Sequence, residues 1–181
     1  MSRRILVAGL GNVLMSDDAI GPYCVAHLLA NYDFADQVEV ADLGSPGLDL
    51  ILHLAAADIV IAIDALRGVA PGSLHVLDHA RLLSGRCDVR LDTHAPALEE
   101  SILIARLSGA RPHQVTLVGL GGANFDHGTG LSALVRAWMP ALVDLVLAQM
   151  TAAGAGWSSR EAKGVPDVWW EASADAGKLF A

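Results

Sequence analysis

The chain has 181 residues, of which 53% are apolar, which is the size and composition of one domain with a substantial buried core. Its formal net charge is −8 and its basic residues are scattered, so we exclude a nucleic-acid-binding surface, which would need the opposite charge. No stretch approaches the ~18–20 uninterrupted apolar residues of a membrane helix, and we expect a cytoplasmic protein without membrane insertion.

Short apolar runs alternate with segments of helical periodicity, which is typical of an α/β protein. The expected strands cover residues 5–10, 38–42, 59–64, 73–77 and 115–120. The expected helices cover residues 17–31, 47–56, 96–107 and 131–150. The run from Ile59 to Asp64 is apolar up to its last residue, so it predicts a central strand that is buried on both faces.

This order of elements predicts a three-layer α/β/α sandwich around a mostly parallel, twisted sheet of about five strands. Only about eight residues link the strand 59–64 to the strand 73–77, too few for a crossover helix, so we expect the latter to be an antiparallel edge strand. The domain is expected to cover residues 1–152. The extension 153–181 is either docked or loosely ordered, and docking is favoured because it contains three tryptophans, Trp157, Trp169 and Trp170.

Polar residues follow the expected parallel strands, at the sheet edge where α/β proteins bind ligands. Ser16-Asp17-Asp18 follows the first strand, Asp42 and Asp64 end the next two, and Asp126-His127 follows the last. A carboxylate beside an apolar strand is costly unless it is paired or bound to a cation, although Asp64 could also cap the following turn. Ser16-Asp17-Asp18 likewise has a structural alternative, since Ser and Asp cap helix N-termini.

The first loop also resembles a dinucleotide-binding turn, because Gly9-Leu10-Gly11 follows a strand and Asp42 ends the next one. The third glycine of that motif is missing, since Leu14 stands in its place. Asp17 and Asp18 occupy the helix start where a pyrophosphate would bind, and their charges would repel it. We therefore expect no nucleotide cofactor.

His94 precedes the helix 96–107, and a helix N-terminus disfavours imidazolium, so this side chain should stay neutral and able to bind a metal. The alternatives are a loop histidine without a function, or His127 as the ligand. Two carboxylates and one imidazole form a three-ligand set with open positions, which suits nickel or zinc. The sequence has no HExxH motif and no Gly-x-Ser-x-Gly elbow, and Cys24 and Cys87 read as free thiols without a base partner.

The order of these motifs resembles that of the hydrogenase maturation endopeptidases. The matching segments are Gly9-Leu10-Gly11-Asn12 through Asp17-Asp18-Ala19-Ile20-Gly21, Asp42-Leu43-Gly44-Ser45-Pro46-Gly47, Ile63-Asp64-Ala65 with Gly68 and Pro71-Gly72, Thr93-His94, and Leu117-Val118-Gly119 with Gly130-Leu131-Ser132. Each motif is weak alone, whereas the ordered set over residues 4–150 is specific. The extension after residue 152 is not part of the shared pattern.

The resemblance implies an endopeptidase that removes the C-terminal extension of a nickel–iron hydrogenase large-subunit precursor after nickel insertion. Carried over by position, its nickel-binding and catalytic residues are Asp18, Asp64 and His94. The nickel would arrive with the precursor, which explains a ligand set with open positions. Two departures from the family pattern are Ala95-Pro96-Ala97, where members often have glycine, and Ala133, where proline is common; the first would alter how His94 is presented.

Two other functions remain open on the sequence. A non-catalytic protein that inspects or carries the metallated precursor would need the same site, and the lack of a familiar nucleophile keeps this alternative open. A nucleotide-binding domain is disfavoured by Asp17 and Asp18.

Overall fold

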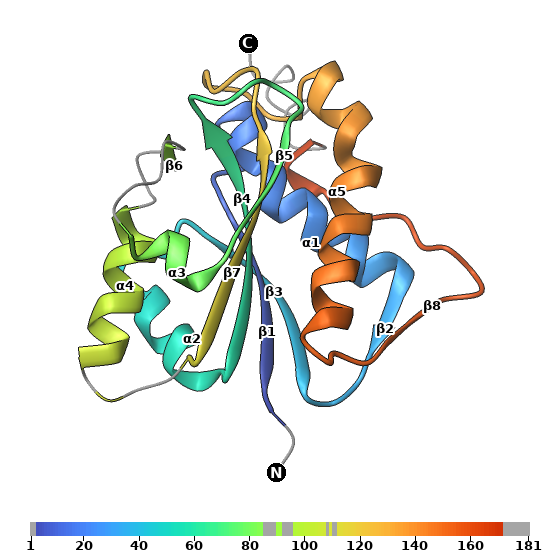
Figure 1. Cartoon of the computed structure of the whole chain (residues 1–181). Helices are drawn as coiled ribbons and strands as arrows, with labels where there is room; N and C mark the ends of the chain where they lie inside the picture. The colour runs from blue at the N-terminus through green and yellow to red at the C-terminus, as the bar shows by residue number, and fades with distance from the viewer. Residues whose placement is uncertain (1–2, 85–89, 92–95, 108, 110–111, 172–181) are drawn as a thin grey trace.

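The protein is built around a twisted sheet with the strand order β3-β1-β4-β7-β5 (Figure 1). The computed structural model describes residues 3–84, 90–91, 96–107, 109 and 112–171. The strands are β1 (Ile5–Leu10), β3 (Val38–Gly44), β4 (Ile59–Arg67), β5 (Leu74–Leu77) and β7 (Gln114–Gly121). All run parallel except β5, which pairs antiparallel with β7 at the edge, and this confirms the prediction from its short link to β4.

Helices cover both faces of the sheet (Figure 1). One face carries α1 (Ile20–Asn31) and α5 (Ala133–Ala152); the other carries α2 (Leu50–Ala56), preceded by the 3-10 turn η2 (Gly47–Asp49), α3 (His79–Leu82) and α4 (Pro96–Leu107). Alternate residues of the central strands enter two separate cores, with Val7 and Ile61 in one and Leu6 and Val60 in the other. The three-layer α/β/α sandwich is thereby confirmed.

The observed boundaries differ from the prediction at the carboxyl edge of the sheet. Asp64 lies inside β4 and does not end it, because β7 continues to pair with β4 as far as Leu66. A further short strand, β6 (Arg90–Leu91), pairs antiparallel with the end of β4. The first helix begins with a 3-10 turn, η1 (Ser16–Ala19), and α1 proper starts at Ile20.

Helix α5 is long and apolar enough to cross a membrane by length and composition alone, and it is the one such helix in the described part of the chain. In the fold it packs against α1, β4 and β7. Its buried residues join the core beneath it, namely Val135, Leu142, Val143, Val146, Leu147 and Met150. Packing on the sheet therefore accounts for the buried part of its apolar composition.

The segment after α5 returns to the α1 side of the molecule (Figure 1). Its strand β8 (Trp157–Ser159) pairs antiparallel with β2 (Tyr32–Phe34), which directly follows α1. Further along, Trp170 is only 3% exposed, and its ring meets that of Tyr23 edge-on with 5.1 Å between the centroids. Strand pairing and a buried aromatic contact thus hold residues 153–171 against the domain.

Residues 160–171, which we call the strap, are attached to the body near both ends. Arg160, the first strap residue, donates a hydrogen bond of 2.9 Å from its guanidinium to the Asp33 carboxylate. At the other end, the carboxylate of Glu171 accepts hydrogen bonds from the Tyr23 hydroxyl and the Arg136 guanidinium. The strap is therefore positioned along α1.

Candidate active site at the carboxyl edge of the sheet

Asp18 and Asp64, two of the three predicted site residues, are buried at the carboxyl ends of neighbouring strands. Asp18 is 1% exposed and Asp64 is 7% exposed. Asp64 follows Ile63, which pairs with Gly9 near the end of β1, and Asp18 lies in η1, which contacts β4. Oδ2 of Asp18 accepts a hydrogen bond of 2.9 Å from the backbone N–H of Asn12, just beyond β1. Both carboxylates therefore belong to the same edge of the sheet.

Burying two carboxylates at one edge is a costly arrangement that points to function. Removing a carboxylate from water costs several kcal/mol unless hydrogen bonds or a cation offset the loss. Besides the bond to Asp18, the backbone N–H of Ala65 donates to Oδ1 of Asp64 at 2.7 Å. Among the described residues no group of three His, Cys, Asp or Glu side chains forms a metal site. Two carboxylates alone offer oxygen donors, and a complete site needs further ligands.

Glycines bring the turn that carries Asp18 close to the strands. A Cβ atom on Gly21 would lie 2.2 Å from the carbonyl oxygen of Leu10 and 2.6 Å from that of Ile63. A Cβ atom on Gly11 would lie 1.8 Å from the carbonyl oxygen of Asp18, and Gly11 has a φ of 134°. The glycines of the first loop therefore serve direct backbone packing of η1 and α1 on β1 and β4.

Asp17 has a structural role that differs from that of its neighbour Asp18. It is fully buried, and its Oδ2 accepts hydrogen bonds from the N–H groups of Ala123 (2.8 Å) and Asn124 (2.9 Å) and from the Ser132 hydroxyl (2.8 Å). Its Oδ1 accepts a fourth bond, of 2.6 Å, from the Ser132 N–H. Ser132 is the N-cap of α5, where a negative charge is favoured. The expected capping of the first helix by Ser16 or Asp17 is therefore wrong, because neither η1 nor α1 has a side-chain cap hydrogen bond, and Asp17 instead holds the start of α5.

Arg67 and Phe125 lie at the same edge and were missed by the sequence analysis. The Arg67 guanidinium stacks on the Phe125 ring, 3.7 Å from the ring centroid. Arg67 ends β4 three residues after Asp64, so a positive charge accompanies the two carboxylates. The sequence did contain a signal for Arg67, since an arginine directly continues the buried apolar strand. His127, the reserve ligand, is exposed in the loop after β7.

His94, the third predicted site residue, lies outside the described residues. The preceding described backbone is β6, in which Leu91 pairs with Leu66 of β4. Leu66 is two residues beyond Asp64 in β4.

Cys24 is a free and fully buried thiol. Burial raises its pKa to about 12, so it stays protonated at neutral pH and is not a nucleophile. Cys87 lies outside the described residues.

Comparisons with known proteins agree with this fold and motif order. The model of the hydrogenase maturation protease family matches residues 22–149. The chain is 32% identical over 161 residues to the hydrogenase 2 maturation protease of Escherichia coli K12, with 88% of this chain and 98% of that protein covered. It is 33% identical over 162 residues to the hydrogenase expression/formation protein HupM of Azotobacter chroococcum, with 88% and 78% covered. The solved structure of the hydrogenase maturating endopeptidase HybD from Escherichia coli superposes with a TM-score of 0.77 at 31% identity, over 87% of this chain and 98% of that one. The chain belongs to the hydrogenase maturation protease family.

Proposed function

We propose that the protein is an endopeptidase that removes the C-terminal extension of a nickel–iron hydrogenase large-subunit precursor, and that it recognises nickel already inserted in that precursor. The observation that carries the proposal is the burial of Asp18 and Asp64 at one edge of the sheet. Membership of the maturation protease family supports the proteolytic activity. The proposal includes action in the cytoplasm, with neither nucleic acid nor membrane insertion involved.

The proposed nickel ligands of this chain are Asp18, Asp64 and His94. The two carboxylates supply oxygen donors from η1 and β4, and the imidazole would supply a nitrogen donor that suits nickel. The third ligand is carried over from the family resemblance, and His94 lies outside the described residues. Nickel is then part of the substrate, and the chain completes a coordination shell that the precursor begins.

Chain cleavage in this proposal uses water, because the described residues offer no activated nucleophile. Cys24 is protonated and buried. A carboxylate that faces the precursor's metal is able to accept the proton of an attacking water, and a metal-polarised peptide carbonyl is the natural target. The Arg67 guanidinium at the same edge would favour negative charge that develops on the carbonyl oxygen.

The decisive experiment is an intact-mass measurement on a nickel-loaded precursor incubated with the protein. We expect loss of a C-terminal peptide, and no loss from a nickel-free precursor. Asp64→Asn and Asp18→Asn should abolish cleavage while the far-UV circular dichroism spectrum is unchanged. Asp144→Asn, an exposed carboxylate on α5, is the matched control and should cleave normally.

Each other outcome of that experiment rejects a defined part of the proposal. A stable complex without cleavage would replace the protease with a protein that inspects the metallated precursor. Equal cleavage of the nickel-free precursor would reject nickel recognition. Full activity of both Asp18→Asn and Asp64→Asn would reject the site.

A further inference from the structure

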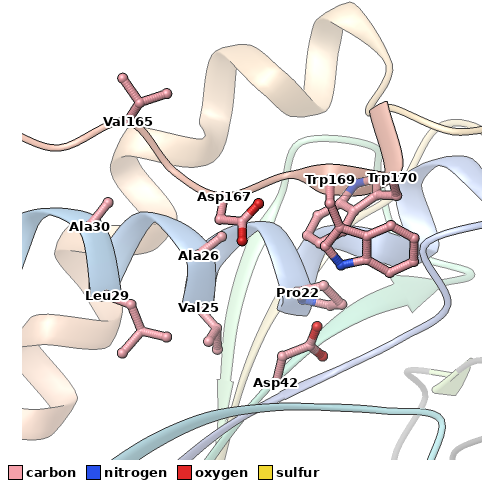
Figure 2. A pocket seen from close by; sticks show the side chains of 10 residues that line it. All are labelled: Pro22, Val25, Ala26, Leu29, Ala30, Asp42, Val165, Asp167, Trp169 and Trp170. Atoms are coloured by element: carbon pink, nitrogen blue, oxygen red, sulfur yellow. The ribbon is translucent and has the colours of Figure 1, made fainter. Parts of the chain in front are cut away.

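A groove of about 340 Å³ lies between α1, the end of β3 and the strap, apart from Asp18 and Asp64 (Figure 2). Helix α1 supplies an apolar wall that includes Pro22 and Leu29. The end of β3 contributes Asp42, and the strap contributes Asp167 and Trp169. Figure 2 shows Asp42, Asp167 and Trp169 among the residues around this groove, so acidic and aromatic groups line one hollow.

The groove is acidic and contains no compensating cation among its described lining residues. Partial desolvation in the groove raises the pKa of Asp42, and its Oδ1 accepts a hydrogen bond of 2.9 Å from the N–H of Gly44. Asp167 is exposed on the strap. The cations of the strap are engaged elsewhere, since Arg160 binds Asp33 and Lys163 donates to Ser159.

The aromatic part of the groove is exposed yet held in place. Trp169 is 60% exposed, an unusual state for a large aromatic side chain. Its ring meets that of Trp170 edge-on, with 5.8 Å between the centroids, and Trp170 is buried against Tyr23. The indole thus presents a positioned ring in the same groove as two carboxylates. Ring faces and carboxylates both attract cations, and a guanidinium can stack on one while it hydrogen-bonds to the other.

We propose that this groove binds an arginine side chain on the surface of the hydrogenase precursor, an inference that rests on the precursor being the partner of this chain. Charge complementarity supports it, because two carboxylates in a chain of net charge −8 favour a basic occupant. The groove also adjoins the candidate active site. Asp42 pairs with Gly9 of β1, and Pro22 follows Asp18 by four residues at the start of α1. A precursor seated at the carboxyl edge therefore reaches the groove with a neighbouring part of its surface.

The first test measures binding of the nickel-loaded precursor to the full chain and its variants. Asp167→Asn and Trp169→Leu should each weaken binding about three- to fivefold, the size expected for one exposed charge or cation–π contact. The cleavage rate at saturating precursor should not change, because neither residue belongs to the proposed catalytic site. Asp144→Asn changes the net charge equally on exposed α5 and should leave the affinity unchanged. An equal loss in Asp144→Asn and Asp167→Asn would overturn the groove in favour of general electrostatic attraction.

The second test uses the small probe N-acetyl-arginine methylamide, with its neutral citrulline analogue as the control. Titration should shift the NMR signals of the Trp169 indole N–H with the arginine probe and not with the citrulline probe, and Asp167→Asn should remove the shift. Equal shifts with both probes would overturn the proposal. So would a dimer in light scattering that Asp167→Asn dissociates, since a second copy would then occupy the groove. If the precursor binds through Asp167 but is never cleaved, the proposed protease activity is rejected and the groove proposal stands. If the precursor is cleaved normally and its binding does not depend on Asp167, the groove proposal is rejected and the proposed protease activity stands.

Discussion

Asp17 and Ser132 are joined by two hydrogen bonds across 115 positions of sequence, one from the backbone N–H at 2.6 Å and one from the hydroxyl at 2.8 Å. The same carboxylate accepts the N–H groups of Ala123 and Asn124. One buried side chain therefore connects η1, the loop after β7 and the start of α5. Because Asp18 is the next residue in η1, its position at the sheet edge depends on this connection.

Asp17→Asn should destabilise the protein by about 3 kcal/mol, since an amide nitrogen would face N–H donors in a fully buried site. Ser132→Ala removes only the hydroxyl bond and should cost about 1–2 kcal/mol. Both values are measured as free energies of unfolding in urea. A loss below about 1 kcal/mol for Asp17→Asn would show that the four hydrogen bonds contribute little.

Gly21→Ala should also impair the fold and the site together. The new Cβ atom would lie 2.2 Å from the carbonyl oxygen of Leu10, so α1 must move away from β1 and β4. We expect a loss of at least about 2 kcal/mol in urea denaturation and slower precursor cleavage. Gly156→Ala is the control, because its Cβ atom would meet only the Ala35 methyl, at 3.2 Å, a contact that a shift of a few tenths of an ångström relieves, so it should cost less than about 1 kcal/mol. Equal effects of the two substitutions would reject the close-packing explanation.

Much of the fold was predictable because its signals are local. The apolar run of β4 and its short link to β5 lie within a few residues of each other, and both were interpreted correctly. The end of β4 was not predictable, because its extension past Asp64 depends on pairing with β7, about 50 residues later.

The candidate site shows the same division between local and distant information. The rule that ligands bind at the carboxyl ends of parallel strands placed Asp18 and Asp64 at one edge, as observed. The different roles of Asp17 and Asp18 were not predictable from the sequence, because both residues have the same side chain and the hydrogen-bond partners of Asp17 lie more than 100 positions away. His94 stays a prediction.

The strap should loosen in acid because of Glu171. Hydrogen bonds from Tyr23 and then from Arg136 lower the pKa of this carboxyl below its usual value. The ionised form is therefore favoured in the folded state. The stabilisation that ionised Glu171 gives to the folded strap is complete above the pKa of glutamate in the unfolded chain, about 4.3. It is lost as the pH falls through the lower pKa of Glu171 in the folded state. Tyr23 stays protonated as a donor throughout, since burial and then Glu171 raise its pKa to about 12.

This pH dependence is measured as amide hydrogen exchange of residues 160–171 between pH 3 and pH 6. Glu171→Gln should give faster exchange than the wild type at pH 6 and should flatten the pH dependence, after correction for intrinsic exchange rates. The effect is expected to stay below about 1 kcal/mol, because the Arg136–Glu171 pair is partly exposed. Equal corrected exchange rates of residues 160–171 in the wild type at pH 3 and at pH 6 would contradict the role assigned to Glu171.

Trp170 should be the main anchor of the strap, and its neighbour Trp169 provides a matched control. Trp170→Ala removes a ring that is 3% exposed and packed on Tyr23, which should cost about 3 kcal/mol of local stability. Trp169→Ala removes a ring that is 60% exposed and should cost less than about 1 kcal/mol. Limited proteolysis distinguishes the two, with rapid cleavage inside residues 160–169 expected only for Trp170→Ala. Since Trp170 also positions the Trp169 indole, the same variant should weaken arginine binding in the groove. Rapid proteolysis with unchanged arginine binding would show that the indole is held by something other than Trp170.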